Sequence, residues 1–132
     1  MKKKILIVTA NYYKNISKGL ILSAKKILQE PFDLIFVPGV FEIPVIISRN
    51  IKKYDGFIAL GCVIKGETPH FEFISRATID AIMKLSIQYK KPIGNGIITC
   101  LNQKQALVRQ KKGREAAAAM LSVLNSIKNS SK

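Results

Sequence analysis

No apolar run in the chain approaches the ~20 residues that an α-helix needs to cross a bilayer. The N-terminus, MKKKILIVTANYY, starts with lysines, but the apolar run that follows extends only from Ile5 to Ala10. Because no small-residue cleavage pattern follows it, this run is typical of a strand and not of a signal peptide. We therefore expect no membrane partner and a cytoplasmic location.

Cysteine and histidine are scarce, since the chain has only Cys62, Cys100 and His70. These residues do not have the spacing of a zinc site, and a single histidine does not complete a set of metal ligands. We expect two reduced cysteines of the core type and no metal ion. Cys62 is not expected to act as a nucleophile.

Acidic residues are also few: eight Asp and Glu face 22 Lys and Arg, which gives a formal net charge of +14. Such a charge suggests a polyanionic partner. The lysines are scattered, however, and no basic stripe interleaved with aromatic residues is present. Only four of the basic residues are arginine, the better residue for recognising phosphate. We therefore expect no nucleic-acid partner, and a basic nucleic-acid-binding domain remains only as a third hypothesis.

Repeats and linkers are absent, and 132 residues with 48% hydrophobic content fit one domain, residues 1–132. Apolar runs between turn signals predict four strands, at Lys4–Thr9, Phe32–Val37, Phe57–Ile64 and Ile93–Cys100. The fourth strand is expected to be interrupted at residues 94–96, Gly-Asn-Gly. Helical spacing predicts helices over residues 17–29, 44–52, 71–89, 102–110 and 114–127.

Strands that alternate with helices predict an α/β fold, with a parallel sheet covered by helices on both faces. This is a three-layer α/β/α sandwich with a four-stranded parallel sheet. The third helix is expected to bury one apolar stripe, formed by Ile74, Ala77, Thr78, Ala81, Ile82 and Leu85.

The stretch from Ile58 to Phe73, IALGCVIKGETPHFEF, carries the most chemistry. It predicts a buried strand, a polar turn and the start of a helix. Gly66 lets backbone amides approach an anion, and the helix start offers unpaired N–H groups. His70 can act as an acid and a base near neutral pH. The alternative is a surface turn with a capping Thr68 and an ordinary histidine.

Three blocks of this sequence resemble those of the lumazine synthase family. GCVIKGETPHFEF resembles the family's strand-end signature G-x-V-I-[RK]-G-x-T-x-H-[FY]-[DE]. VPGVFEIP, from Val37 to Pro44, resembles the second block, and NGIITCLNQKQALVR, from Asn95 to Arg109, the third. The blocks occur in the family's order and spacing, and the match covers nearly the whole chain. The resemblance implies flavodoxin-like topology with strand order 2-1-3-4.

The resemblance also implies a reaction. It would join 5-amino-6-(D-ribitylamino)uracil to 3,4-dihydroxy-2-butanone 4-phosphate and form 6,7-dimethyl-8-ribityllumazine, with release of phosphate and water, in riboflavin biosynthesis. This chemistry consists of proton transfers and losses of water or phosphate, so it needs positioning and one acid–base group but no cofactor. The implied partners are these two small molecules, inorganic phosphate in the empty site, and further copies of the chain in a pentamer or a multiple of it.

Residue by residue, the resemblance makes His70 the proton carrier and Arg109 the phosphate-binding arginine, with Lys112 near it. Tyr12 would stack on the pyrimidine, and Glu42 would accept hydrogen bonds from the ribityl hydroxyls. Asn95 stands where the family often has Phe, and the loop between Arg109 and Lys112 is shorter than usual. The remaining implied substrate contacts are Val40, Phe41, Cys62, Val63, Ile64, Glu67 and Thr68.

Simpler interpretations of the same residues stay open. Tyr12 could be a surface aromatic, Glu42 a charge at a helix N-terminus, and Arg109 an exposed residue at a helix end. A second hypothesis for the whole chain is a flavin- or nucleotide-binding module without catalysis. The segment TANYYKN after the first strand lacks the glycine-rich phosphate loop that such a module would have.

Overall fold

The computed structural model describes residues 3–67 and 69–130. Its centre is one four-stranded sheet in the order β2-β1-β3-β4, and all three neighbouring pairs are parallel. This confirms the predicted parallel sheet and its order. The strands are β1 (Ile5–Ala10), β2 (Phe32–Val37), β3 (Gly56–Ile64) and β4 (Ile93–Cys100).

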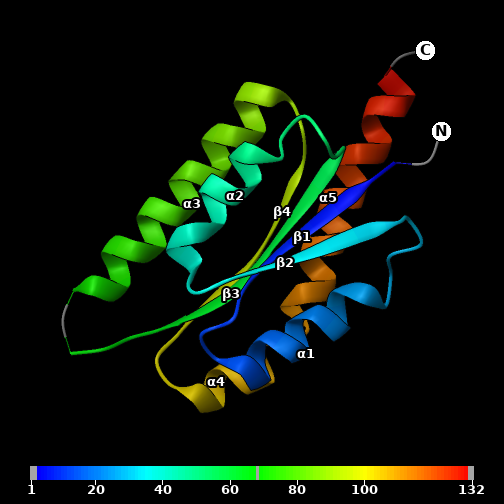
Figure 1. Cartoon of the computed structure of the whole chain (residues 1–132). Helices are drawn as coiled ribbons and strands as arrows, with labels where there is room; N and C mark the ends of the chain where they lie inside the picture. The colour runs from blue at the N-terminus through cyan, green and yellow to red at the C-terminus, as the bar shows by residue number, and fades with distance from the viewer. Residues whose placement is uncertain (1–2, 68, 131–132) are drawn as a thin grey trace.

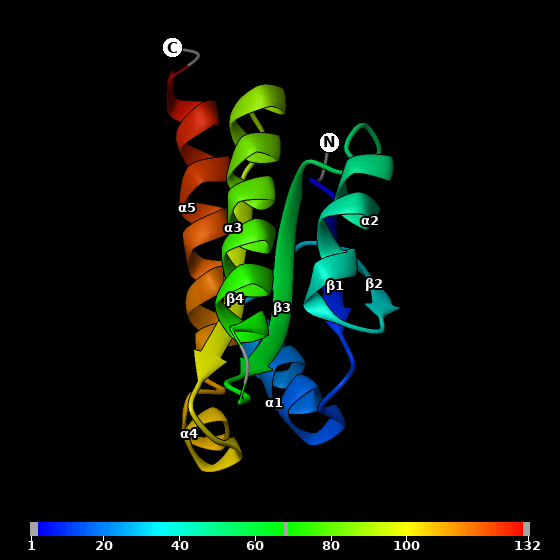
Figure 2. The same ribbon diagram turned by 90° about the vertical axis from the view of Figure 1, so that its left-hand side faces the viewer.

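Helices cover both faces of this sheet, so the predicted three-layer sandwich is confirmed. The helix pair α2 and α3 lies on one face, and α1 and α5 lie on the other (Figure 1). The short α4 lies beyond the end at which β3 and β4 finish (Figure 2). The helices are α1 (Lys14–Lys25), η1 (Val40–Glu42), α2 (Ile43–Arg49), α3 (His70–Tyr89), α4 (Gln103–Val108) and α5 (Lys112–Ser130).

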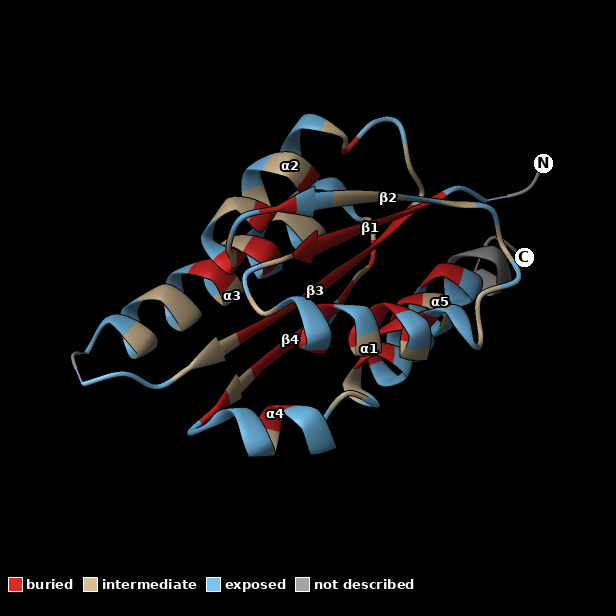
Figure 3. Cartoon of the chain, turned by 60° about the horizontal axis from the view of Figure 1, so that its bottom comes forward, coloured by how far each residue is buried: buried red, intermediate tan, exposed pale blue. Residues whose placement is uncertain are grey.

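The core lies against the two faces of the sheet. All six residues of β1 are buried, as are the first seven of β3 (Figure 3). A parallel sheet covered on both faces requires such continuous apolar strands. No helix among the described residues is long and apolar enough to cross a membrane.

The first helix is where the predicted boundaries were most wrong, because α1 spans Lys14–Lys25 and not residues 17–29. Ser17 suggested a helix start, yet it is buried within the first turn. Its hydroxyl donates to the carbonyls of Ala10 (2.6 Å) and Tyr13 (3.0 Å), so it is satisfied inside the helix. The other helix boundaries differ from the predicted ones by three residues or fewer.

The predicted interruption of the fourth strand is wrong, because β4 runs unbroken from Ile93 to Cys100. Its glycines have a packing role instead. A Cβ atom on Gly94 would collide with the backbone carbonyl of Ala116 in α5. Glycine at this position therefore lets α5 lie directly against the strand.

Helix α3 buries less than its sequence predicted. Only Thr78 and Ile82 of its 20 residues are buried, and Ala77, predicted to be buried, is exposed. Apolar residues occur around more of this helix than one face, so the pattern could not identify the side against the sheet. Phe73, Met83 and Ile87 remain 56% to 69% exposed. Exposed apolar side chains gathered on one element are typical of an interaction surface.

Candidate active site

The carboxyl ends of the strands bring most of the predicted site residues to one edge of the sheet. Open parallel sheets bind their ligands at this edge. Tyr12 follows β1, the segment from Val40 to Glu42 follows β2, and Cys62, Val63 and Ile64 end β3. Glu67 and His70 lie in and after the next loop, and both are exposed. Thr68 lies outside the described residues.

Strand β3 extends beyond its neighbour β1. Its pairing with β1 ends at Leu60, opposite Thr9, whereas its pairing with β4 continues to Ile64, opposite Cys100. No described strand therefore pairs with Gly61–Ile64 on the β1 side. This open edge of β3 offers backbone donors and acceptors to a planar partner that has its own hydrogen-bonding edge.

Apolar side chains lie at the start of the open edge of β3. Val40 packs over Gly61, where an added Cβ would lie 2.6 Å from Val40 Cγ1. Tyr12 and Phe41 are 74% and 59% exposed, although both belong to ordered segments next to the core. Two large aromatic side chains left open to solvent beside such an edge suit the stacking of a flat ring.

Tyr13 is a further candidate for the site that the sequence analysis did not single out. Its ring meets Tyr12 edge to face, with the ring centroids 4.8 Å apart and the planes at 79°. Tyr13 packs against the core beside Tyr12, and the pKa of its hydroxyl is raised, mainly by burial and next by the neighbouring Cys62. Tyr13 therefore helps to hold the ring of Tyr12 in place. The two consecutive tyrosines are the sequence feature that could have indicated this role.

Glu42 is half-buried at the end of η1, and its Oε1 accepts a hydrogen bond from the backbone N–H of Gly39. The carboxylate thus already has a structural partner. This agrees with both interpretations of Glu42, as a charge near a helix start and as an acceptor at the site.

Both cysteines are free and buried. Cys62 pairs with Ile98 and Cys100 with Ile64, so the thiols lie diagonally on one face of neighbouring strands. Burial first, and the neighbouring Cys100 second, raise the pKa of the Cys62 thiol to about 12. Such a thiol stays protonated near neutral pH, which is consistent with a packing role.

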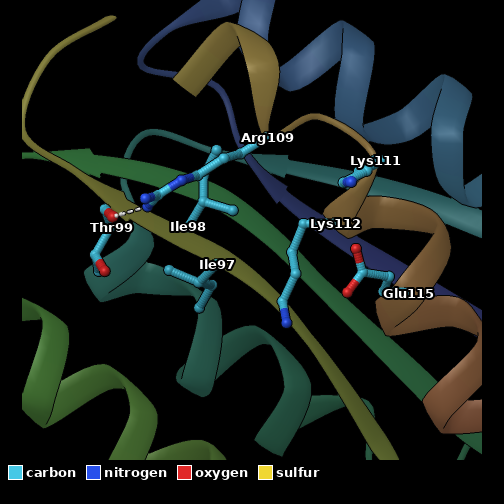
Figure 4. Close-up of a pocket in the computed structure, with 7 residues that line it drawn as sticks. All are labelled: Ile97, Ile98, Thr99, Arg109, Lys111, Lys112 and Glu115. Atoms are coloured by element: carbon cyan, nitrogen blue, oxygen red, sulfur yellow. Dashed lines mark hydrogen bonds between the residues drawn. The ribbon is translucent and has the colours of Figure 1, made fainter. Parts of the chain in front are cut away.

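A second group of predicted residues lies along the outer side of β4. Arg109 and Lys112 line an open hollow of about 280 Å³ (Figure 4). Lys111 and Glu115, which the sequence analysis did not single out, also line it, so the lining holds three basic residues and one acidic residue. Arg109 Nη1 reaches across β4 and donates to the Thr99 carbonyl at 3.0 Å. We call this the cationic hollow, and it is lined by Ile97, Ile98, Thr99, Arg109, Lys111, Lys112 and Glu115.

Asn95 belongs to neither group within one chain. It is the third residue of β4, opposite Ala59 and five positions before the carboxyl end at Cys100. Its exposed side chain turns along its own strand, and Oδ1 accepts from Ile97 N at 3.0 Å. The resemblance to the lumazine synthase family implies that Asn95 enters the site of a neighbouring copy, and within one chain Asn95 lies away from the edge where the other site residues gather.

Fold and candidate site together define a class: a flavodoxin-like α/β protein with exposed aromatic residues and a histidine at the carboxyl edge of its sheet, and a cationic hollow beside β4. Comparison with known proteins identifies the family. The family model of 6,7-dimethyl-8-ribityllumazine synthase matches residues 2–128. The chain belongs to this family.

Relatives that bear this enzyme's name are similar over most of their length. The chain is 43% identical to 6,7-dimethyl-8-ribityllumazine synthase of Bartonella tribocorum, over 94% of this chain and 91% of that one. It is 44% identical to the protein of that name from Bartonella bacilliformis, over 84% and 78%. It is 40% identical to that of Agrobacterium fabrum, over 93% of each.

Proposed function

We propose that this chain condenses 5-amino-6-(D-ribitylamino)uracil with 3,4-dihydroxy-2-butanone 4-phosphate to 6,7-dimethyl-8-ribityllumazine, the penultimate step of riboflavin biosynthesis. The observation that carries the proposal is the open edge of β3, together with the exposed aromatic side chains of Tyr12 and Phe41 in the segments that follow β1 and β2. Membership of the lumazine synthase family supports the same activity. We also infer that residues 1–132 act as one domain, since helices on both faces share a single sheet.

The pyrimidine binds at the open edge of β3. The backbone of Cys62, Val63 and Ile64 pairs with its polar edge, while Tyr12 stacks on the ring. Val40 and Phe41 enclose it, and Glu42 accepts hydrogen bonds from the ribityl hydroxyls. The geometry that supports this arrangement is the unpaired strand edge, the two exposed aromatic rings and the half-buried carboxylate.

The four-carbon substrate binds through its phosphate. Arg109 grips the phosphate oxygens, because a planar guanidinium can donate two parallel hydrogen bonds. Lys112 adds positive charge, and the amides of Glu67 and Thr68 contact the same group. The three cationic side chains of the cationic hollow support this role.

His70 then moves protons during the condensation. The pyrimidine's amine attacks the ketone, a proton passes to the departing water, and the imine forms. Loss of phosphate and ring closure follow, each with a proton transfer. The position of His70, exposed at the start of α3 and just after the loop that ends β3, supports this role.

The complete site requires two copies of the chain in a head-to-tail ring. Tyr12, Glu42 and His70 come from one copy, and Asn95 and Arg109 from its neighbour. The support is that Asn95 lies five positions before the carboxyl end of β4 in its own chain, and that the cationic hollow lies on the outer β4 edge. The exposed apolar residues of α3 offer further surface for assembly. A pentamer, or a multiple of it, is the assembly we propose; the cytoplasmic location stays a prediction.

The direct test is to mix the purified protein with both substrates and to follow the absorbance and fluorescence of the lumazine. We expect product to accumulate only with both substrates present, with one phosphate released per lumazine. A protein that binds flavin or pyrimidine but forms no lumazine would instead be the binding module considered above. A mass measurement in solution tests the ring, and a monomer would contradict it.

A further inference from the structure

Helix α4 carries Arg109 at its end, and it is too short to be stable alone. It has six residues, and only Ala106 among them is buried. Isolated helices below about 12 residues are marginal in water. Besides Ala106, which packs in the core, the contacts at the two ends of the helix therefore help to set the orientation of α4, and with it that of Arg109.

The N-terminal end is closed by two reciprocal hydrogen bonds. Asn102 Oδ1 accepts from the backbone N–H of Gln105 at 2.9 Å. Gln105 Oε1 accepts from the backbone N–H of Leu101 at 2.8 Å. This is the arrangement of a capping box, with the returning bond made one residue earlier than usual. It attaches the first turn of α4 to the residue that directly follows β4.

The C-terminal end returns to the same strand. The Arg109 backbone N–H donates to Ala106 O at 3.1 Å, and Arg109 Nη1 donates to Thr99 O at 3.0 Å. Nη1 also lies 3.9 Å from Cys100 Sγ. One donor of the guanidinium is thus used to fix the side chain on β4. A guanidinium has five N–H donors, so several remain for an anion.

We propose that Asn102 and Gln105 are positioning residues that hold Arg109 ready for the phosphate of the four-carbon substrate. This rests on the proposed function of Arg109. The pair, which we call the α4 clamp, touches neither substrate. It acts by keeping α4 formed, so that the guanidinium is already in place over Thr99 when the phosphate arrives. Preorganisation of this kind lowers the entropy lost on binding.

The test uses Asn102→Ala and Gln105→Ala in the full chain. Without either cap bond α4 opens more often, and the dissociation constant of inorganic phosphate, measured by calorimetry, should rise about three- to tenfold. The KM for the four-carbon substrate should rise by a similar factor, while the KM for the pyrimidine stays within about twofold. Asn102→Asp keeps the acceptor oxygen and should restore phosphate affinity.

Gln103→Ala is the matched control, because Gln103 is an exposed glutamine of the same short helix. It should bind phosphate like the unaltered protein. Loss of affinity in Gln103→Ala equal to that in Gln105→Ala would overturn the proposal, because any change in α4 would then have the same effect. So would unchanged phosphate affinity in both clamp variants.

A double-mutant cycle shows whether the clamp acts through Arg109. In an Arg109→Ala background, Asn102→Ala should lower kcat/KM for the four-carbon substrate by less than about twofold. If Asn102→Ala lowered kcat/KM in the Arg109→Ala background as much as it does in the unaltered protein, the proposal would be contradicted. Calorimetry tests the α4 clamp separately from the proposed reaction. If the protein forms no lumazine but the clamp variants still bind phosphate more weakly, the proposed reaction is wrong and the role of the clamp is supported.

Discussion

Glu42 Oε1 accepts a hydrogen bond from the backbone N–H of Gly39 across a distance of 3.0 Å, and this bond closes the turn between β2 and α2. The same oxygen lies 3.3 Å from the position that a Cβ on Gly39 would occupy. Glycine at position 39 therefore leaves room for the carboxylate. The consequence is that the turn itself sets the position of Glu42 before any ligand binds.

Substitution of Glu42 should separate its two roles. Glu42→Gln keeps an oxygen for Gly39, so we expect the free energy of unfolding to change by less than about 0.5 kcal/mol. Glu42→Ala should lose about 1 kcal/mol of stability. Both variants should raise the KM for the pyrimidine, about tenfold for Ala, because the ribityl hydroxyls lose a charged acceptor. An unchanged KM for the pyrimidine in Glu42→Ala would leave Glu42 with a capping role only.

Substitution of Arg109 should change the KM for one of the two substrates only. Arg109→Ala should raise the KM for 3,4-dihydroxy-2-butanone 4-phosphate by roughly 10- to 100-fold, because it removes charged hydrogen bonds to the phosphate. Arg109→Lys should restore only part of this, since a point charge does not replace the planar fork. Inorganic phosphate should compete with this substrate in the unaltered protein. Equal effects on the KM of both substrates, or no competition by phosphate, would argue against the assignment.

The strands, and the edge of the sheet at which the candidate site residues gather, could be predicted from the sequence for physical reasons. Apolar runs between turn signals identify strands even where they are only partly buried, so Phe32–Val37 and Ile93–Cys100 were predicted with their observed bounds. The gathering of the candidate site residues at one edge could also be predicted, because the carboxyl ends of parallel strands share one edge of the sheet. The predicted start of α1 was wrong because local patterns do not reveal that Ser17 bonds back to Ala10.

Three-dimensional neighbours were harder to predict. Lys111 and Glu115 line the cationic hollow because α5 packs against β4, which no local pattern states. Tyr13 was missed because its role depends on its contact with Tyr12. The position of Ala77 depends on which side of α3 faces the sheet, and an apolar residue also suits a contact with another chain.

Gly94 should be essential for stability through the contact between β4 and α5. Gly94→Ala places a Cβ against the Ala116 carbonyl, which cannot move without shifting the helix. We expect a loss of about 1–3 kcal/mol in the free energy of unfolding, measured with denaturant. Gly66→Ala is the matched control, because nothing lies within 4 Å of its added Cβ. If both variants were equally stable, close packing at Gly94 would not be the reason for glycine there.

The Cys62 thiol should be unreactive in the folded protein. Its pKa is raised from the ordinary 9.0 to about 12. In a Cys100→Ala variant, where burial remains the main cause, iodoacetamide at about pH 8 should alkylate folded protein at least 100-fold more slowly than unfolded protein. Because the folded state holds its proton more tightly, stability should fall as the pH rises from about 9 toward 12. Equal labelling of folded and unfolded protein would contradict the burial of this thiol.

We propose that the synthase site is built from two copies of the chain, with His70 on one and Arg109 on the other. His70→Ala should lower turnover about 10- to 1000-fold, since the condensation also proceeds slowly unaided, and Arg109→Ala should also be weak alone. The decisive measurement is lumazine formation after the two variants are unfolded together in equal amounts and reassembled. About a quarter of the interfaces in a randomly mixed ring then pair an intact His70 with an intact Arg109. We predict activity well above the average of the separate variants, approaching that fraction of the unaltered protein. Activity no higher than that average would place the whole site in one chain and contradict the account.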